Sequence, residues 1–159
     1  MNIIDYNSKY DNDIKDLLVE LQEYIVSIDE DGYNIITDEY REIYFAKTMK
    51  EVKDFQGKMF LAVEDDKAIG LIVGLINNED EHNYYFKAPK RGRISELVVS
   101  RKYRSKGAGK QLMDTMEDYF RLVGCKAILL EVFAYNKNAK MFYNKRNYHG
   151  RTEDIMKEL

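Results

Sequence analysis

The chain has 159 residues, of which 45% are hydrophobic and 33% charged, so we expect one globular domain over residues 1–159 and exclude a wholly disordered chain. The formal net charge is −3, but residues 1–80 hold 8 basic and 19 acidic side chains, whereas residues 81–159 hold 17 basic and 9 acidic ones. The overall charge argues against general nucleic-acid binding, which needs a basic surface, so the basic second half needs a local explanation.

No segment of the sequence predicts membrane insertion or export. The longest apolar run, residues 68–76, is nine residues long, well short of the roughly 20 that a membrane-spanning helix requires. The first residues lack the basic and apolar segments of a secretory signal. Cys125 is the only cysteine, which excludes an internal disulfide. These features predict a cytoplasmic protein that does not associate with membranes.

The first half of the chain predicts a strand, two helices and a strand hairpin. In chain order these are a strand at 3–6, a helix from Asp11 or Asn12 to Ile28, a helix from Thr37 or Asp38 to about Val52, and strands at 59–64 and 68–76. Asp11 or Asn12 is the expected N-cap of the first helix. Asp65-Asp66-Lys67 is expected to form the hairpin turn.

The second half alternates strands and helices. The expected elements are a sheet extension at 84–86, a strand at 93–99, a helix ending near Val123 with Gly124 as its stop, a strand at 127–132, a helix at 138–146, and closing strands at Tyr148 and at 155–159. This order predicts a mixed α/β protein whose crossovers lie mainly in the second half.

The most informative segment is the basic turn between the strand at 93–99 and the helix that follows. The first amide N–H groups of a helix lack partners inside the helix and lie at its positive end, which makes an anion site. Gly107 and Gly109 let the backbone approach a ligand closely, and Arg104, Lys106 and Lys110 add positive charge. The turn is therefore a candidate phosphate-binding site.

Spacing excludes two common phosphate motifs. A Walker loop would need Gly and Ser or Thr at the positions of Arg104 and Gln111. A dinucleotide-binding fingerprint would need Gly where Leu112 stands.

The pattern that does fit is Arg-x-x-Gly-x-Gly at Arg104, Gly107 and Gly109, followed by a second block that contains Asn136, Ala139, Phe142, Tyr143 and Tyr148. Together the two blocks cover about residues 93–148, and they resemble the GCN5-related N-acetyltransferase (GNAT) superfamily, whose members bind acetyl-CoA. The resemblance implies an α/β (α+β) fold with a mixed, mostly antiparallel central sheet of six to seven strands and about four helices. It also makes a homodimer through the sheet edge an open expectation.

The resemblance assigns cofactor roles position by position. Backbone groups of Leu97, Val98 and Val99 would pair with the pantetheine arm, and the amides of Ser105, Lys106, Gly107, Ala108, Gly109 and Lys110 would hold the pyrophosphate, with Arg104 opening the loop. Asn136 would contact the pantetheine, and Tyr143 would lie beside the thioester sulfur. Ser105 and Asn147 stand where Gly is common, and Asn tolerates the left-handed backbone that the second position needs.

Acetyl transfer to an amine needs a base and an acid. An alkyl amine has a pKa near 10 and is mostly protonated at neutral pH, so a carboxylate must accept a proton, while Tyr143 can protonate the departing sulfur. Glu96 resembles an acidic position of amine-acetylating members, and Glu131 matches the base spacing of ribosomal-protein N-terminal acetyltransferases; the sequence leaves both open, and either could instead be a strand-end charge. The Val99 amide could stabilise the oxyanion. No metal is required.

An acidic segment lies where the superfamily usually places the acceptor wall. Residues 29–42 contain Asp29, Glu30, Asp31, Asp38, Glu39 and Glu42 against Arg41 alone. This charge favours a cationic acceptor such as a polyamine, an aminoglycoside or a lysine-bearing peptide, although acidic residues also favour helix N-termini.

Three functional hypotheses follow. The leading one is an acetyl-CoA-dependent N-acetyltransferase (EC 2.3.1 class) that acts on a primary amine by direct attack in a ternary complex. The alternative is a non-catalytic acyl-CoA-binding sensor or regulatory module, and the third is a purely structural α/β domain.

Overall fold

The computed structural model describes residues 1–77 and 87–159. It contains a five-stranded sheet with the strand order β1-β2-β3-β4-β5. The strands are β1 (Asn2–Asp5), β2 (Lys58–Glu64), β3 (Lys67–Asn77), β4 (Arg91–Val99) and β5 (Ala127–Leu130). The first four strands pair antiparallel, and β5 alone lies parallel to its neighbour β4. The predicted mixed, mostly antiparallel sheet is thus confirmed.

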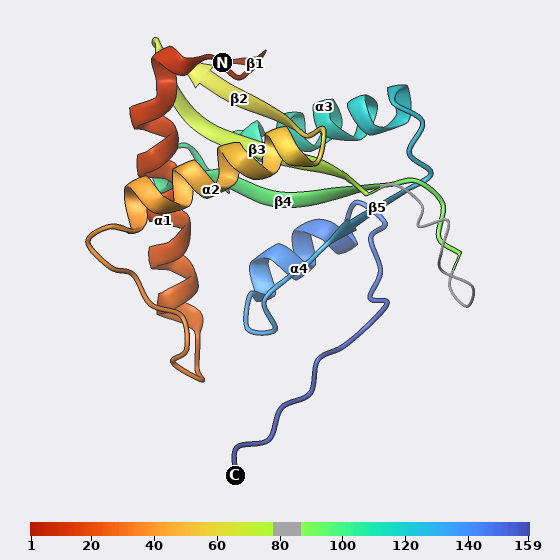
Figure 1. The fold of residues 1–159 in the computed structure, drawn as a ribbon. Coiled ribbons are helices and arrows are strands. Elements are labelled where there is room, and N and C mark those ends of the chain that lie inside the picture. Colours follow the sequence, from red (N-terminus) through yellow and green to blue (C-terminus); the bar gives the residue numbers. More distant parts are fainter. Residues whose placement is uncertain (78–86) are drawn as a thin grey trace.

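Helices cover both faces of the sheet (Figure 1). They are α1 (Asp11–Ile28), α2 (Tyr40–Asp54), α3 (Ala108–Leu122) and α4 (Lys137–Asn144), with short 3₁₀ turns at Ser8–Tyr10 and Arg101–Tyr103. One face buries the apolar side of α1 together with partly buried side chains of α2, and the other face buries that of α3. Partly buried side chains of α4 also pack on the α3 side.

The hairpin of β2 and β3 forms the centre of the core. Every residue from Ala68 to Ile76 is buried, as expected of a strand covered on both faces. Asp65 and Asp66 in the turn have φ of 50° and 59°, the left-handed pair of a two-residue hairpin turn. The predicted hairpin and its turn are confirmed.

The helix ends differ from the expected ones by a few residues. Asn7 accepts a hydrogen bond from the Lys9 amide and caps the 3₁₀ turn, so α1 begins directly after Tyr10 and neither Asp11 nor Asn12 is its cap. The α2 helix starts at Tyr40, later than the expected Thr37 or Asp38.

The prediction of six to seven strands is too high for the described residues, because the closing strands at Tyr148 and 155–159 are wrong. After α4 no strand forms in residues 145–159, which run away from the sheet (Figure 1). Tyr148 instead packs its ring on Tyr143, and Ile155 is 90% exposed. An apolar residue without a neighbouring strand to pair with gains nothing from an extended conformation. The expected extension at 84–86 lies outside the described residues.

Candidate functional site

A gap opens between β4 and β5. The two strands pair over only four positions, from Arg91 opposite Ala127 to Ile94 opposite Leu130. The strand β4 continues for five residues beyond this point, while the chain leaves β5 and turns toward α4. Beyond Ile94, none of the described strands pairs with this edge of β4.

Backbone alternation identifies which groups of β4 face that gap. The Ser100 amide donates to the Ile69 carbonyl at 2.9 Å, on the β3 side. In an antiparallel pair the inward-facing and outward-facing residues alternate, so the backbone groups of Val98 also face β3. The backbone groups of Leu97 and Val99 therefore face the open edge, where an extended amide chain can pair with them.

A β-bulge interrupts the pairing of β4 with β3 at the point where the edge toward β5 becomes unpaired. The register moves from Ile94 opposite Gly74 to Glu96 opposite Val73, which leaves Ser95 as the extra residue. The bulge places Glu96 next to α2, where the Tyr44 hydroxyl donates to Glu96 Oε1 at 2.6 Å.

Glu96 is the most perturbed carboxyl among the described residues. Its exposed fraction is 8%, and burial raises the pKa of Glu96 to about 7 against the opposing effect of the Tyr44 hydrogen bond. A carboxyl with this pKa is partly ionised at neutral pH and can exchange a proton with a substrate.

Glu131 has a different environment. It follows β5, and its side chain is 87% exposed and pairs with Arg93 at 3.2 Å. The strand expected at 127–132 ends at Leu130, so Glu131 lies just beyond β5, next to the strand β4 that carries Glu96, and of the two carboxyls only Glu96 is buried.

The basic turn opens α3 as an uncapped helix N-terminus. Gly107 is the N-cap with φ of 87°, and Ser105 also has a left-handed φ of 64°. The first bond of the helix runs from the Gln111 amide to the Gly107 carbonyl at 3.1 Å, and no side chain caps the amides of Ala108 through Lys110. These amides and the helix dipole point at a common anion position.

Arg104 fastens this turn to its surroundings. Its Nε donates to the Val99 carbonyl at 2.9 Å, and its guanidinium lies 5.6 Å from the ring centre of Tyr24 and 3.8 Å from the Glu20 carboxylate. The two α1 residues are four apart and so share a helix face. Sequence reasoning did not find this role of Glu20, because the contact joins residues more than 80 positions apart.

The α4 helix brings two further predicted site residues to the gap. Asn136 is the N-cap: its Oδ1 accepts from the Ala139 amide at 3.0 Å and from the Tyr24 hydroxyl at 3.3 Å. Burial raises the pKa of Tyr143 to about 12, so its phenol is protonated at neutral pH. Within residues 1–77 and 87–159 the Tyr143 hydroxyl has no hydrogen-bond partner, so it is available to a ligand.

A partly buried ion-pair cluster holds α4 on α3. Arg146 reaches Asp114 at 2.7 Å and Glu117 at 2.8 Å, and the Tyr148 hydroxyl donates to Glu117 at 3.3 Å. Asn147 adopts the left-handed φ of 64° that the turn requires, as expected. The cluster fixes the helix that carries Tyr143. No local sequence pattern predicted these ion pairs.

The acidic segment is partly used for its own structure. Asp29 accepts bonds from the backbone and side-chain amides of Asn34, and Glu42 pairs with Lys15 and Arg41. Asp31 accepts from the Tyr135 hydroxyl at 3.5 Å, which brings this segment beside the β5–α4 connection.

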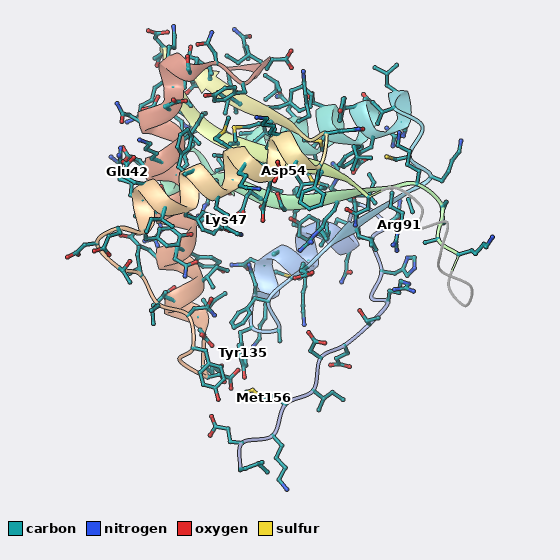
Figure 2. All side chains as sticks on the ribbon, in the orientation of Figure 1. Glu42, Lys47, Asp54, Arg91, Tyr135 and Met156 are labelled. Carbon is teal, nitrogen blue, oxygen red and sulfur yellow. The ribbon has the colours of Figure 1, made fainter. Side chains whose placement is uncertain are left out.

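Figure 2 shows Tyr135 in the β5–α4 connection, and Lys47 and Asp54 along α2. Within the described part of the chain, no three His, Cys, Asp or Glu side chains are grouped closely enough to hold a metal ion. Over the same residues, no helix has the length and apolar character needed to cross a membrane.

Comparison with known proteins identifies the family. Residues 29–148 match the model of the Acetyltransferase (GNAT) family. The chain is 23% identical over 114 residues to glucosamine 6-phosphate N-acetyltransferase from Arabidopsis thaliana, covering 72% of this chain and 74% of that protein. It is 30% identical over 93 residues to the uncharacterized N-acetyltransferase MJ1530 of Methanocaldococcus jannaschii, covering 58% of this chain and 53% of that protein.

Solved structures share the whole fold. A tetramutant of the BH1408 protein from Bacillus halodurans superposes with a TM-score of 0.87 at 20% identity, covering all of both chains. The aminoglycoside N-acetyltransferase AAC(6')-Iy, in a complex with CoA, superposes with a TM-score of 0.71 at 14% identity, covering 99% of this chain and 98% of that one. The motif blocks at 93–148, the parted strands β4 and β5, and the family match agree: the chain belongs to the Acetyltransferase (GNAT) family.

Proposed function

We propose that the protein transfers an acetyl group from acetyl-CoA to a primary amine by direct attack in a ternary complex. One observation carries the proposal: Glu96, a buried carboxyl with a pKa of about 7, lies on the same strand whose open edge leads into the uncapped, basic entrance of α3. In this proposal the base lies on β4, and the anion site lies at the turn that follows the same strand.

The residues at the gap fit the parts of acetyl-CoA. The amides of residues 105–110 and the charges of Arg104, Lys106 and Lys110 suit a pyrophosphate. The outward-facing backbone of Leu97 and Val99 suits the amides of the pantetheine arm, and Val98 between them packs into the core. Asn136 lies at the start of α4 on the other side of the gap. The cofactor supplies the acetyl group as a thioester.

Glu96 and Tyr143 supply the proton chemistry in this proposal. Acetylation forms a C–N bond and breaks the C–S bond, and two protons leave an ammonium acceptor. Glu96 accepts the first proton, which makes the nitrogen a nucleophile. Tyr143 gives its proton to the sulfur and regains one from the nitrogen by way of solvent, so the thiol leaves protonated.

Glu96 is favoured over Glu131 as the base. The Glu131 carboxylate is exposed and paired with Arg93, whereas Glu96 is buried and burial raises its pKa to about 7, close to the working range. The acceptor is proposed to be cationic because the acidic segment at 29–42 lies beside the β5–α4 connection.

The test measures thiol release from acetyl-CoA with a panel of amines. Glu96→Gln is expected to lower kcat/KM by about 10²-fold or more, the usual contribution of a general base. The same variant should still bind CoA, seen as an unchanged rise in melting temperature with CoA. The matched control, Glu131→Gln, should retain activity within a few-fold. Tight CoA binding by the wild-type chain with no amine-dependent thiol release would support a binding module instead.

A further inference from the structure

The α2 helix presses an aromatic pair against the β4 bulge. The rings of Tyr40 and Tyr44 stack with centroids 4.8 Å apart and planes 14° from parallel. Only the second hydroxyl reaches the site: it donates to Glu96 Oε1 at 2.6 Å, a short bond of the charge-assisted kind. A helix and a strand residue more than 50 positions apart in sequence are therefore joined at Glu96, whose carboxyl alone is buried among the described acidic residues.

This contact makes the two oxygens of Glu96 inequivalent. The oxygen Oε1 is occupied by the phenol, while no described residue donates a hydrogen bond to Oε2. A side chain held by one oxygen cannot rotate freely, so the other oxygen keeps a fixed direction. Burial and the nearby carboxylates raise the pKa of Tyr44 far above its usual value, so the phenol remains a donor throughout the working pH range.

We propose that Tyr44 is a positioning residue for acetyl transfer: it holds Glu96 through Oε1 and leaves Oε2 to accept the proton of the acceptor ammonium. This inference rests on the proposed function, in which Glu96 is the base. It assigns different roles to the two carboxylate oxygens and gives α2 a role in the chemistry.

Other charges face Glu96 without replacing this bond. Lys47 and Glu51 lie on α2 and Arg93 on β4; the two cations lower the pKa of Glu96, and Glu51 raises it. The Lys47 ammonium lies 4.9 Å from the centre of the Tyr44 ring, and no described cation hydrogen-bonds to the Glu96 carboxylate. The Tyr44 phenol is the direct hydrogen-bond donor, so its removal should change the pKa of Glu96 measurably despite these longer-range charges.

The first test is the pH profile of Tyr44→Phe, which keeps the stacked ring and removes the donor. Because the lost bond stabilised the ionised form, the acidic limb of kcat/KM should move to higher pH by about one unit. At the high-pH plateau kcat should still be lowered several-fold, since Glu96 is no longer oriented, while KM for acetyl-CoA stays unchanged. The control, Tyr40→Phe, removes a hydroxyl from the same pair that makes no bond to Glu96, and its profile should match that of the wild type.

Two further measurements separate this inference from the proposed function. In the Glu96→Gln background, Tyr44→Phe should cause no further loss, because Tyr44 acts through Glu96. The Glu96 carboxyl can also be titrated by carbon NMR without any substrate, and its midpoint should rise in Tyr44→Phe and not in Tyr40→Phe. An unmoved midpoint, or an additive loss in the double variant, overturns the positioning role. If the wild-type chain acetylates no amine, the proposed function fails, while the titration still decides whether Tyr44 holds the carboxyl.

Discussion

Glu96 links proton chemistry to stability. Burial raises its pKa from 4.5 to about 7 in the folded chain, so between these values the folded state keeps a proton that the unfolded state has lost. Stability from this group is therefore fully present below about pH 4.5 and declines as the pH rises toward 7. A buried ionised carboxylate is a cost that the protein bears above neutral pH.

Glu96→Gln should reveal this cost, since the amide keeps an acceptor for Tyr44 but carries no charge. The variant is expected to become more stable than the wild type by up to about 3 kcal/mol as the pH rises from 4.5 to 7, and the difference should then level off. Urea unfolding of both proteins at a series of pH values checks the sign. A difference that stays constant over this range would show that Glu96 does not titrate abnormally.

At the scale of elements, the turn that precedes α3 contains backbone strain at a residue that is not glycine. Ser105 and Gly107 both have left-handed φ angles, of 64° and 87°, yet only one is glycine. A side chain in this region costs about 1–2 kcal/mol, whereas glycine adopts it freely at some cost in unfolded-state entropy. A β-carbon on Gly107 would meet nothing within 4 Å, so the backbone angle alone decides there.

Opposite substitutions at these two positions should have opposite effects. Ser105→Gly is expected to stabilise the chain by about 0.5–1 kcal/mol, and Gly107→Ala to destabilise it by about 1–2 kcal/mol. Thermal or urea unfolding measures both. Should Ser105→Gly prove destabilising, its hydroxyl would have to hold the turn through a contact that outweighs the backbone strain.

The central elements were predictable because their signals are local. The apolar run at 68–76, the Asp-Asp turn and the Gly124 stop each follow from neighbouring residues alone, and each is confirmed. The helix α1 begins at Asp11, within the expected range, but its N-cap was missed because a short 3₁₀ turn capped by Asn7, with no apolar period of its own, precedes the helix. The closing strands failed for a different reason: a strand at 155–159 needs a pairing partner, and apolar composition does not supply one.

The candidate site was predictable in its residues and not in its contacts. Spacing located Arg104, Gly107 and Tyr143, but both Glu96 and Glu131 satisfied the sequence pattern equally. Only the burial of Glu96 under α2 distinguishes them, and burial depends on packing between distant segments. The partners Tyr44 and Arg146 were invisible for the same reason.

At the scale of the whole molecule, the charge division of the sequence predicts salt dependence. Glu30, Asp38 and Glu39 of the acidic segment make no ion pair with described residues, so their field is available to an incoming cation. The KM for a cationic amine should rise several-fold between about 0.05 and 0.5 M salt, because the Debye length shrinks well below 10 Å. A neutral amine acceptor should show little change.

Neutralising those three acids, as Glu30→Gln, Asp38→Asn and Glu39→Gln, should raise the KM for the cationic amine and flatten its salt dependence. The matched control neutralises three exposed acids elsewhere, as Asp65→Asn, Glu153→Gln and Asp154→Asn, with the same change in net charge. Equal effects of the two triple variants would mean that only the total charge matters and would remove the argument for a cationic acceptor.

The short pairing of β4 with β5, over four positions, also affects local opening of the molecule. In the described part of the chain, β5 pairs with the sheet over these four positions, and Ile128 and Leu130 pack partly buried against the core. The Arg93–Glu131 ion pair lies just beyond β5, and the Tyr24–Asn136 hydrogen bond joins α1 to the start of α4. Segments attached by so few bonds open at a lower free energy than a central hairpin. A ligand bound between β4 and β5 would contact both strands, so its binding would stabilise β5 against local opening.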